Sequence, residues 1–249
     1  MNVGAMSDPG KVRDMNEDNY CVYDNHIQLY MVADGMGGHN GGEVASLIAI
    51  NTIKEHVTTY IDHESEEAST VGILYEAFNR ANQEILKRAV DDISCDGMGT
   101  TVTLGLVIGN TLYVGHIGDS RAYLIENGGV RQITQDHSLV AELVRNGSIS
   151  ESEAMRHPQK NVITRALGTD LNMKVDIFSL DFNGASGLIL CTDGLTNFVD
   201  LHEIEEVILG SQDPQESCET LVKLANKRGG YDNITVVFAK ISLIEAEGR

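Results

Sequence analysis

Aromatic and basic side chains are scarce in this sequence. It has no Trp, aromatic residues make up 5%, and 18 Lys and Arg stand against 37 Asp and Glu, which gives a formal net charge of −19. Nucleic acids need cations along their phosphates and often aromatic rings against their bases, so a nucleic-acid-binding protein is disfavoured. The same negative charge opposes binding to an anionic membrane surface.

Long apolar runs and paired cysteines are also missing. No segment reaches the about 18–20 apolar residues of a membrane span or resembles a signal peptide, so we expect a cytoplasmic protein without a membrane anchor. The four cysteines, Cys21, Cys95, Cys191 and Cys218, form no Cys-x-x-Cys pair. A zinc ribbon and a dithiol redox site are therefore disfavoured, and reduced thiols in the core are expected.

The apolar content is sufficient for a packed core. Hydrophobic residues make up 42% of the 249 residues, which excludes a disordered chain. No internal repeat, linker or low-complexity tract divides the sequence. We therefore predict one domain over residues 1–249.

Strand-like and helix-like patterns occur in separate groups along the chain. The first half predicts a strand over 27–33, a helix from about 43, a second helix over 71–85, and hairpins over 101–117 and 121–134. The second half predicts short helices over 138–145 and after Ser150, strands over 175–180, 187–192 and 234–241, and helices over 201–209 and 214–227. Helices do not alternate one for one with strands, so two antiparallel sheets covered by helices fit better than a doubly wound parallel sheet.

Four aspartates occupy similar positions, each where an apolar strand meets a turn. Asp34, Asp119 and Asp193 follow strands, and Asp232 precedes one. Each alone is also explained as an ordinary turn residue. Together, if these strand ends meet at one edge, they predict a cation site, because clustered carboxylates repel one another without a cation. An all-oxygen ligand set selects hard cations such as Mg²⁺ or Mn²⁺.

A second acidic group lies near the N-terminus. Glu17 and Asp18 add two carboxylates, and Arg13 precedes them by a few residues. The segment is also compatible with a solvated polar turn. Beside a metal cluster, the planar guanidinium of Arg13 would suit the capture of phosphate oxygens.

Motifs of several other hydrolytic and phosphate-binding sites are absent from the sequence. No Lys precedes Ser or Thr, as a Walker-type loop requires, and Asn40 stands where a G-x-G-x-x-G loop would need its third Gly. There is no G-x-S-x-G, no H-E-x-x-H, and no Cys with an Arg six positions later. Serine hydrolases, zinc metalloproteases and cysteine-dependent phosphatases are therefore disfavoured.

Six motifs follow one another along the chain. They are Asn16-Glu-Asp-Asn19, Val32-Ala-Asp-Gly-Met-Gly-Gly-His39, Gly97-Met-Gly-Thr-Thr101, Gly115-His-Ile-Gly-Asp-Ser-Arg-Ala-Tyr123, Thr192-Asp-Gly-Leu195 and Tyr231-Asp-Asn-Ile-Thr235. In this order they resemble the metal-dependent protein phosphatases of type 2C, and most closely the compact bacterial serine/threonine phosphatases. The resemblance extends from about Val3 to Ile241. It implies an α+β fold with a central antiparallel β-sandwich flanked by helix pairs, in α-β-β-α layers, and a metal cluster at one edge.

The resemblance also implies roles for the acids. Two or three Mn²⁺ or Mg²⁺ ions would be held by Asp18, Asp34, the Gly35 carbonyl, Asp119, Asp193 and Asp232, with Glu17 acting through water. The pair Asp119 and Asp193 would hold the third ion. Arg13 matches the arginine that binds phosphate, and residues 146–165 would form a flap beside the site. A water bridging two cations would attack phosphorus, so no phosphoenzyme is needed.

The proton donor for the leaving group is left open. Met36 stands where eukaryotic relatives carry a His proposed as the general acid. His39, His157 and a metal-bound water are therefore the candidates. Both histidines are also compatible with structural roles in their loops.

The resemblance predicts Mn²⁺- or Mg²⁺-dependent hydrolysis of phosphoserine and phosphothreonine on proteins by a monomer that opposes a bacterial Ser/Thr kinase. The alternative is a catalytically silent, phosphate-binding regulatory module on the same fold. Such modules usually lose metal-binding acids, and none is missing here. A phosphodiesterase or nuclease is a third possibility, which the net charge and the scarce aromatic residues oppose.

Overall fold

Two antiparallel sheets, stacked face to face, form the centre of this computed structural model, which describes residues 1–38 and 41–241. The first sheet has the strand order β1 (Asn2–Asp8), β11 (Ile234–Lys240), β10 (Ala185–Cys191), β7 (Arg121–Glu126) and β8 (Gly129–Gln132). The second has the order β2 (Asp18–Asp24), β3 (Gln28–Met36), β5 (Val102–Ile108), β6 (Thr111–Ile117) and β9 (Asp176–Asp181), and the short β4 (Gly99–Thr100) pairs with β3.

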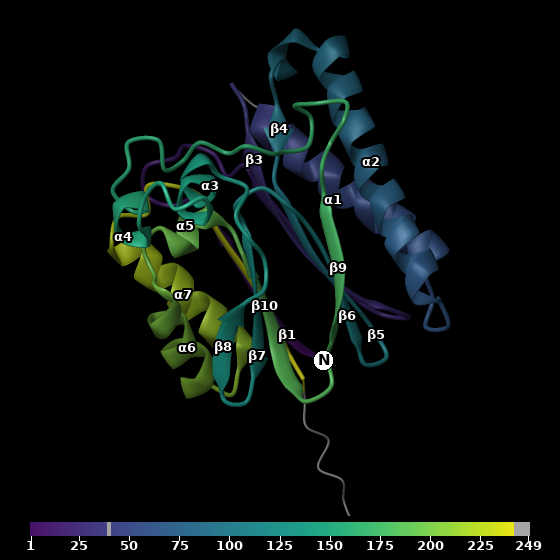
Figure 1. Ribbon diagram of the computed structural model, residues 1–249, viewed down its shortest axis with the longest axis vertical. Helices are drawn as coiled ribbons and strands as arrows, with labels where there is room; N and C mark the ends of the chain where they lie inside the picture. Colours follow the sequence, from purple (N-terminus) through teal and green to yellow (C-terminus); the bar gives the residue numbers. More distant parts are fainter. Residues whose placement is uncertain (39–40, 242–249) are drawn as a thin grey trace, which may run out of the picture.

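A pair of helices covers the outer face of each sheet (Figure 1). Helices α1 (Gly41–Tyr60) and α2 (Glu67–Asp91) pack on the second sheet, and α6 (Leu201–Gly210) and α7 (Pro214–Lys227) pack on the first. A third apolar cluster lies between the sheets and includes Tyr30, Leu112, Leu124 and Val237. These layers confirm the predicted α-β-β-α sandwich.

Apolar periodicity explains why the longest helix forms where it does. In α2, Leu74, Phe78, Ala81 and Ile85 step by three and four residues, and all four are buried against the second sheet. The predicted hairpins also form, as β5–β6 and β7–β8. The sequence pattern predicts neither β1 nor β2. Asp18 and Asn19 begin the strand β2, whereas Asn16 and Glu17 lie in the loop before it.

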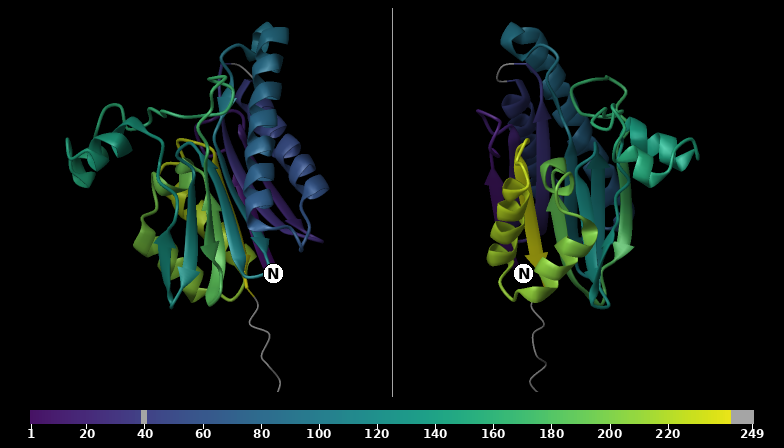
Figure 2. Two further views of the ribbon diagram at one scale, coloured as in Figure 1. Left: turned by 45° about the vertical axis from the view of Figure 1, so that its right-hand side comes forward. Right: turned by 90° about the vertical axis from the view of Figure 1, so that its left-hand side faces the viewer.

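A small helical projection stands out from the sandwich between β8 and β9 (Figure 2). It contains α3 (Leu139–Arg145) and α4 (Glu151–Ala154), and no residue of either helix is buried. The helix predicted after Ser150 is α4, whose start is held by a capping box of Ser150 and Glu153. Two further short helices are η1 (Ile93–Cys95) and α5 (Asp193–Thr196).

The cysteines lie in the core, as the sequence predicts. All four cysteines are free and buried. None of the helices in the described part of the chain has the length and apolarity needed to cross a lipid bilayer.

Candidate metal centre

Strand pairing in the second sheet brings two of the predicted acids together. Asp18 on β2 lies directly opposite Asp34 on β3. The next residue, Gly35, pairs with Thr100 of β4, which closes the end of this sheet. A Cβ on Gly35 would come within 2.1 Å of the Gly42 carbonyl oxygen, so only glycine allows this close approach of the two segments.

Strand direction in the first sheet collects the other three. Cys191, the last residue of β10, pairs with Arg121, the first residue of β7, and β10 pairs in the same antiparallel sense with β11 on its other side. The residues that follow the end of β10 therefore lie beside the turns that precede β7 and β11. Asp193 lies two residues after β10, and Asp119 and Asp232 each lie two residues before β7 and β11, respectively.

A cavity of about 420 Å³ opens where the two sheet ends meet. Seven of the sequence-predicted site residues line it, namely Arg13, Glu17, Asp34, Gly35, Asp119, Asp193 and Asp232. Met36 also lines it, and so does the segment that returns from the projection to the sandwich, through Asn161, Ile163, Thr164, Arg165 and Ala166. The predicted flap thus borders the same cavity as the acids.

Asp18 lies behind the cavity wall rather than on it. It is 5% exposed, and its Oδ2 accepts hydrogen bonds from the hydroxyls of Thr192 (2.8 Å) and Thr235 (2.7 Å). Burial raises the pKa of Asp18 to about 7 despite these two hydrogen bonds. The charged form of this buried carboxyl is therefore disfavoured unless a cation lies close to it.

The neighbouring acids show the same electrostatic strain. Burial, and then the nearby Asp18 and Asp193 carboxylates, raise the pKa of Asp34 well above its ordinary value. Burial, and then Asp193, raise the pKa of Asp119 to about 8. The pKa of Asp193 is raised by burial and by Asp232. These acids therefore repel one another across the edge of the sandwich.

The donor set fits a hard cation. One buried carboxylate oxygen of each of Asp18, Asp119 and Asp193 has no hydrogen-bond partner. Buried polar atoms are almost always paired, so the orphaned oxygens of Asp119 and Asp193 at the cavity, with that of Asp18 behind its wall, indicate a group that they are built to bind. Oxygen ligands without Cys or His favour Mg²⁺ or Mn²⁺ over zinc.

The side chains are not arranged as a finished coordination shell. Within residues 1–38 and 41–241, no group of three or more His, Cys, Asp and Glu side chains converges closely enough to hold a metal ion. Several of the carboxylates are instead directed to protein donors: Asp232 to Arg13, Asp18 to the two threonines, and Asp193 to Asn197. Rotation of these side chains is needed to bring the oxygens together.

Arg13 is paired with one of the predicted ligands. Its Nη2 lies 3.0 Å from Asp232 Oδ2 and its Nε lies 3.0 Å from Asp232 Oδ1, which is a two-point contact. The Arg13 side chain is 49% exposed at the cavity wall. A guanidinium in this position can exchange the carboxylate for the oxygens of a phosphate, which present similar geometry.

Asn233, which sequence reasoning assigned no role, fixes the N-terminal loop. Its Oδ1 accepts from the Glu17 backbone N–H (2.8 Å), and its Nδ2 donates to the carbonyls of Pro9 (3.0 Å) and Met15 (2.9 Å). Arg13 and Glu17 thereby lie beside Asp232. The Asp-Asn pair in the motif at 231–235 was the only sequence signal for this role.

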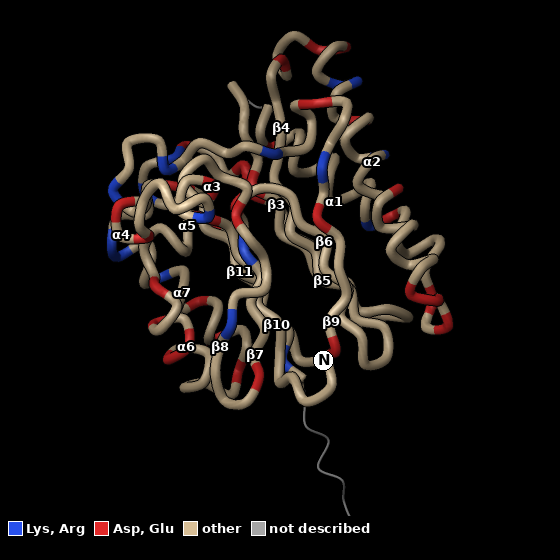
Figure 3. Tube along the Cα trace, viewed as in Figure 1, with Lys and Arg blue, Asp and Glu red and all other residues tan. Residues whose placement is uncertain are grey.

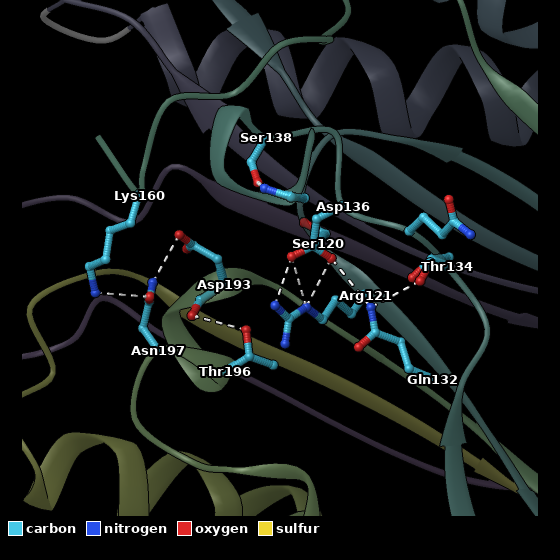
Figure 4. Close-up of polar contacts among 12 residues, drawn as sticks. Ser120, Arg121, Gln132, Thr134, Asp136, Ser138, Lys160, Asp193, Thr196 and Asn197 are labelled. Atoms are coloured by element: carbon cyan, nitrogen blue, oxygen red, sulfur yellow. Dashed lines mark hydrogen bonds and ion pairs between the residues drawn. The ribbon is translucent and has the colours of Figure 1, made fainter. Parts of the chain in front are cut away.

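Asn197 is a second polar residue that the sequence analysis missed. Its Nδ2 donates to Asp193 Oδ2 (3.0 Å), and its Oδ1 lies 3.5 Å from the Lys160 ammonium (Figure 4). Asn197 follows Asp193 by one helical turn, which places both side chains on the same face of α5. The orientation of the Asp193 carboxylate is thus linked to the flap.

Contacts of Thr101 and Arg121 hold the chain directly after Asp119. The Asp34 backbone N–H donates to Thr101 Oγ1 (3.0 Å), which lies 2.9 Å from Ser120 Oγ. Arg121 grips Asp136 with Nε and Nη2, at 2.9 and 2.7 Å (Figure 4). A planar fork of this kind fixes direction as well as distance.

The two histidines considered as proton donors are not among the residues that line the cavity in the described part of the chain. His157 is half-buried in the flap, accepts a hydrogen bond from the Gln159 backbone N–H, and does not line the cavity. His39 lies outside the described residues. The structure therefore does not place His157 against the acids.

A four-layer α-β-β-α sandwich with carboxylates and one arginine around an edge cavity has the features of a phosphohydrolase that uses divalent cations. Residues 12–233 match the family model for protein phosphatase 2C. The serine/threonine phosphatase stp of Listeria innocua is 38% identical over 254 residues, covering all of this chain and 99% of that protein. Protein phosphatase PhpP of Streptococcus pneumoniae is 33% identical over 249 residues, covering 99% of this chain and all of that protein.

The chain is also similar to solved structures of bacterial serine/threonine phosphatases. The serine/threonine phosphatase Stp1 from Staphylococcus aureus superimposes with a TM-score of 0.90 at 34% identity, covering 97% of this chain and 96% of that one. The serine/threonine phosphatase PstP/Ppp of Mycobacterium tuberculosis gives a TM-score of 0.85 at 36% identity, covering 96% and 98%. The chain belongs to the protein phosphatase 2C family, whose members are metal-dependent protein serine/threonine phosphatases.

Proposed function

We propose that this chain, as one catalytic domain over residues 1–249, removes phosphate from phosphoserine and phosphothreonine on proteins with two or three Mn²⁺ or Mg²⁺ ions. The observation that carries the proposal is the set of orphaned, buried carboxylate oxygens at and directly behind the wall of a single cavity that Arg13 also lines. Asp18, Asp34, Asp119, Asp193 and Asp232, with the Gly35 carbonyl, would hold the ions, and Glu17 would act through water.

Each part of the site has a separate task in this proposal. Bound divalent cations would neutralise phosphate charge and lower the pKa of water, which makes it a better nucleophile. Arg13, beside Asp232, would bind and orient the phosphate oxygens. Asn197 holds the direction of the Asp193 carboxylate, and the two threonines hold that of Asp18. The flap, residues 146–165, would border the bound phosphopeptide.

The wider setting is part of the proposal. Relatives of this chain are named as serine/threonine phosphatases, so phosphorylated proteins are its substrates. A Ser/Thr kinase that makes those phosphoproteins would be its opposing enzyme, and the protein would act in the cytoplasm as a monomer. The candidates for the proton donor stay His39, His157 and a metal-bound water, of which His157 does not line the cavity.

Substitution of one acid tests the proposal. Asp193→Asn keeps the shape of the side chain and removes its charge, so phosphate release from a phosphothreonine peptide with Mn²⁺ should fall by at least about 100-fold. Asp181→Asn, at the exposed far end of β9, is the matched control and should retain activity. Circular dichroism checks that both variants fold.

Three results would contradict the proposal. Full activity of the folded Asp193→Asn variant would remove the acid cluster from the reaction. Binding of the phosphopeptide by the wild type without phosphate release would favour the silent regulatory module, and preferential cleavage of a phosphate bis-ester would favour a phosphodiesterase.

A further inference from the structure

A buried histidine outside the acid cluster grips the turn that carries Asp119. His137 is 1% exposed, and its backbone N–H donates to the Gly118 carbonyl (2.8 Å). Its side-chain Nδ1 accepts from the Gly118 backbone N–H (3.1 Å). Both polar groups of the residue before Asp119 are thus bound by a single residue that lies 19 positions away.

These contacts fix the tautomer of His137. Because the Gly118 N–H can only donate, Nδ1 carries a lone pair, and the neutral ring must hold its proton on Nε2. Nε2 lies 3.0 Å from Asp176 Oδ2 on β9 and donates to it. Arg165 Nη1 also lies 3.1 Å from Nε2, but because both groups are donors, the Arg165 hydrogen bond goes to Asp176 Oδ1. The ring therefore reaches from the Gly118 turn on one side to β9 on the other, with a defined direction of each hydrogen bond.

His137 and its partner Asp176 are both connected to the base of the flap. Arg165 Nη1 lies 3.1 Å from Asp176 Oδ1, and the Thr164 N–H donates to the His137 carbonyl (2.7 Å). Both residues belong to the flap segment that lines the cavity. His116 packs against the ring, with centroids 4.8 Å apart, and leaves it little room to turn.

The turn itself has little freedom to compensate. Gly118 has φ of +114°, and a Cβ there would lie 2.4 Å from Thr101 Cβ. The next residue, Asp119, is 8% exposed, and its Oδ1 has no hydrogen-bond partner. The backbone clamp of His137 therefore fixes the turn from which the Asp119 side chain projects.

We propose that His137 is a positioning residue. Through the Gly118 peptide it orients the Asp119 carboxylate toward a bound cation, and its contacts with Asp176 and Thr164 link this orientation to the base of the flap. The proposal rests on the proposed function, in which Asp119 is a cation ligand. His137 itself touches neither the cation nor the phosphate. Residues that orient ligands in this way typically affect metal affinity by about 10–100-fold when replaced.

Two substitutions separate the two ends of the ring. His137→Asn places an amide oxygen near the position of Nδ1, so it can still accept from Gly118 but cannot reach Asp176. His137→Gln places its amide near the position of Nε2, so it can reach Asp176 but leaves the Gly118 N–H without an acceptor. Asp119→Asn serves as the reference for loss of the ligand itself.

Mn²⁺ binding to each full-length variant, followed by the loss of the electron paramagnetic resonance signal of free Mn²⁺, is the measurement. We expect Asp119→Asn to lose one Mn²⁺ or bind it at least tenfold more weakly, and His137→Gln to weaken the same ion about tenfold or more. His137→Asn should stay within about threefold of the wild type. In the Asp119→Asn background, His137→Gln should cause no further loss, because the two changes act on one ligand.

The outcomes distinguish the two proposals. Unchanged Mn²⁺ binding in Asp119→Asn would overturn the assignment of Asp119 as a ligand, and with it the role of His137. Loss in Asp119→Asn but not in folded His137→Gln would overturn the role of His137 alone. Equal weakening in His137→Asn and His137→Gln would also overturn it, because the Gly118 clamp would then not be the cause. If His137→Gln does not fold, weakened binding in His137→Asn still contradicts the proposal.

Discussion

His116 shows how a single buried side chain can make stability depend on pH without taking part in the cation site. Its Nδ1 lies 2.9 Å from Thr103 Oγ1, and its Nε2 donates to the Gln135 carbonyl (3.1 Å). Burial, and then the neighbouring His137, lower the pKa of His116 to about 4. The ring is therefore neutral in the folded protein at pH values where an exposed histidine would take up a proton.

The sign of the effect follows from this pKa. Between about pH 6.5 and pH 4 the unfolded chain binds a proton at residue 116 and the folded chain does not, so acidification favours unfolding. We expect His116→Gln, which retains a donor for Gln135, to remove this contribution. The wild type should lose of order 1–3 kcal/mol more than the variant between pH 7 and pH 4, as measured by urea unfolding. Parallel pH profiles for the two proteins would contradict this explanation.

Sequence reasoning at the residue scale located the acids better than their partners. Asp34 and Asp193 stand out because each follows an apolar strand directly and precedes a glycine. Asn197 and Asn233 carry no comparable signal, since a polar residue after a turn is ordinary. The two threonines that hold Asp18 lie 174 and 217 residues away from it, and only the folded chain brings them there.

At the scale of elements, a close approach of β1 and α7 closes one side of the first sheet. A Cβ on Gly4 would lie 2.3 Å from the Pro214 carbonyl carbon and 2.4 Å from the Gln215 nitrogen, both backbone atoms at the start of α7. The Ala5 N–H also donates to Gln215 Oε1 (3.0 Å). The helix can therefore rest directly on the strand only because residue 4 is glycine.

The same substitution at two glycines should have opposite effects. Gly4→Ala forces β1 and α7 apart and should lower the free energy of unfolding by about 1–3 kcal/mol. Gly72→Ala, on the exposed face of α2 with no atom within 4 Å of the added Cβ, should raise it by about 0.5–1 kcal/mol. Chemical denaturation of the two variants beside the wild type measures both values. A neutral Gly4→Ala would show that α7 does not rest on β1 as described.

Elements with a strong apolar period are predictable from the sequence, and those defined by their partners are not. The stripe in α2 and the hairpin around Gly109-Asn110 are local patterns, and both form where expected. β1 has one buried residue among seven and pairs only with β11, more than 200 residues away. Its strand conformation depends on that distant partner rather than on its own side chains.

At the scale of the whole molecule, charge is distributed unevenly over a strongly acidic protein. Figure 3 shows basic residues around α3 and α4, whereas acidic residues are spread over the helical layers and the site edge. The flap contributes Arg156, Lys160 and Arg165, and Arg165 lines the cavity together with the carboxylates. The net charge of −19 therefore does not describe the charge at every part of the surface.

The overall architecture follows from sequence more fully than the details of the site. Grouped helices and hairpins predict two helix-covered antiparallel sheets, and the fold confirms them. The convergence of Asp119, Asp193 and Asp232 required the actual strand order, because β7, β10 and β11 are neighbours in space but far apart in sequence. The roles of these acids as cation ligands stay a prediction.

Phosphate release from a phosphothreonine peptide, measured with Mn²⁺, then with excess chelator, and then with Mn²⁺ restored, tests the central claim most directly. We predict release with Mn²⁺, loss of release with chelator, and recovery when Mn²⁺ again exceeds the chelator. Release that continues unchanged in chelator would contradict the claim that the carboxylate cluster acts through bound cations. So would the absence of release from a protein that binds Mn²⁺ tightly.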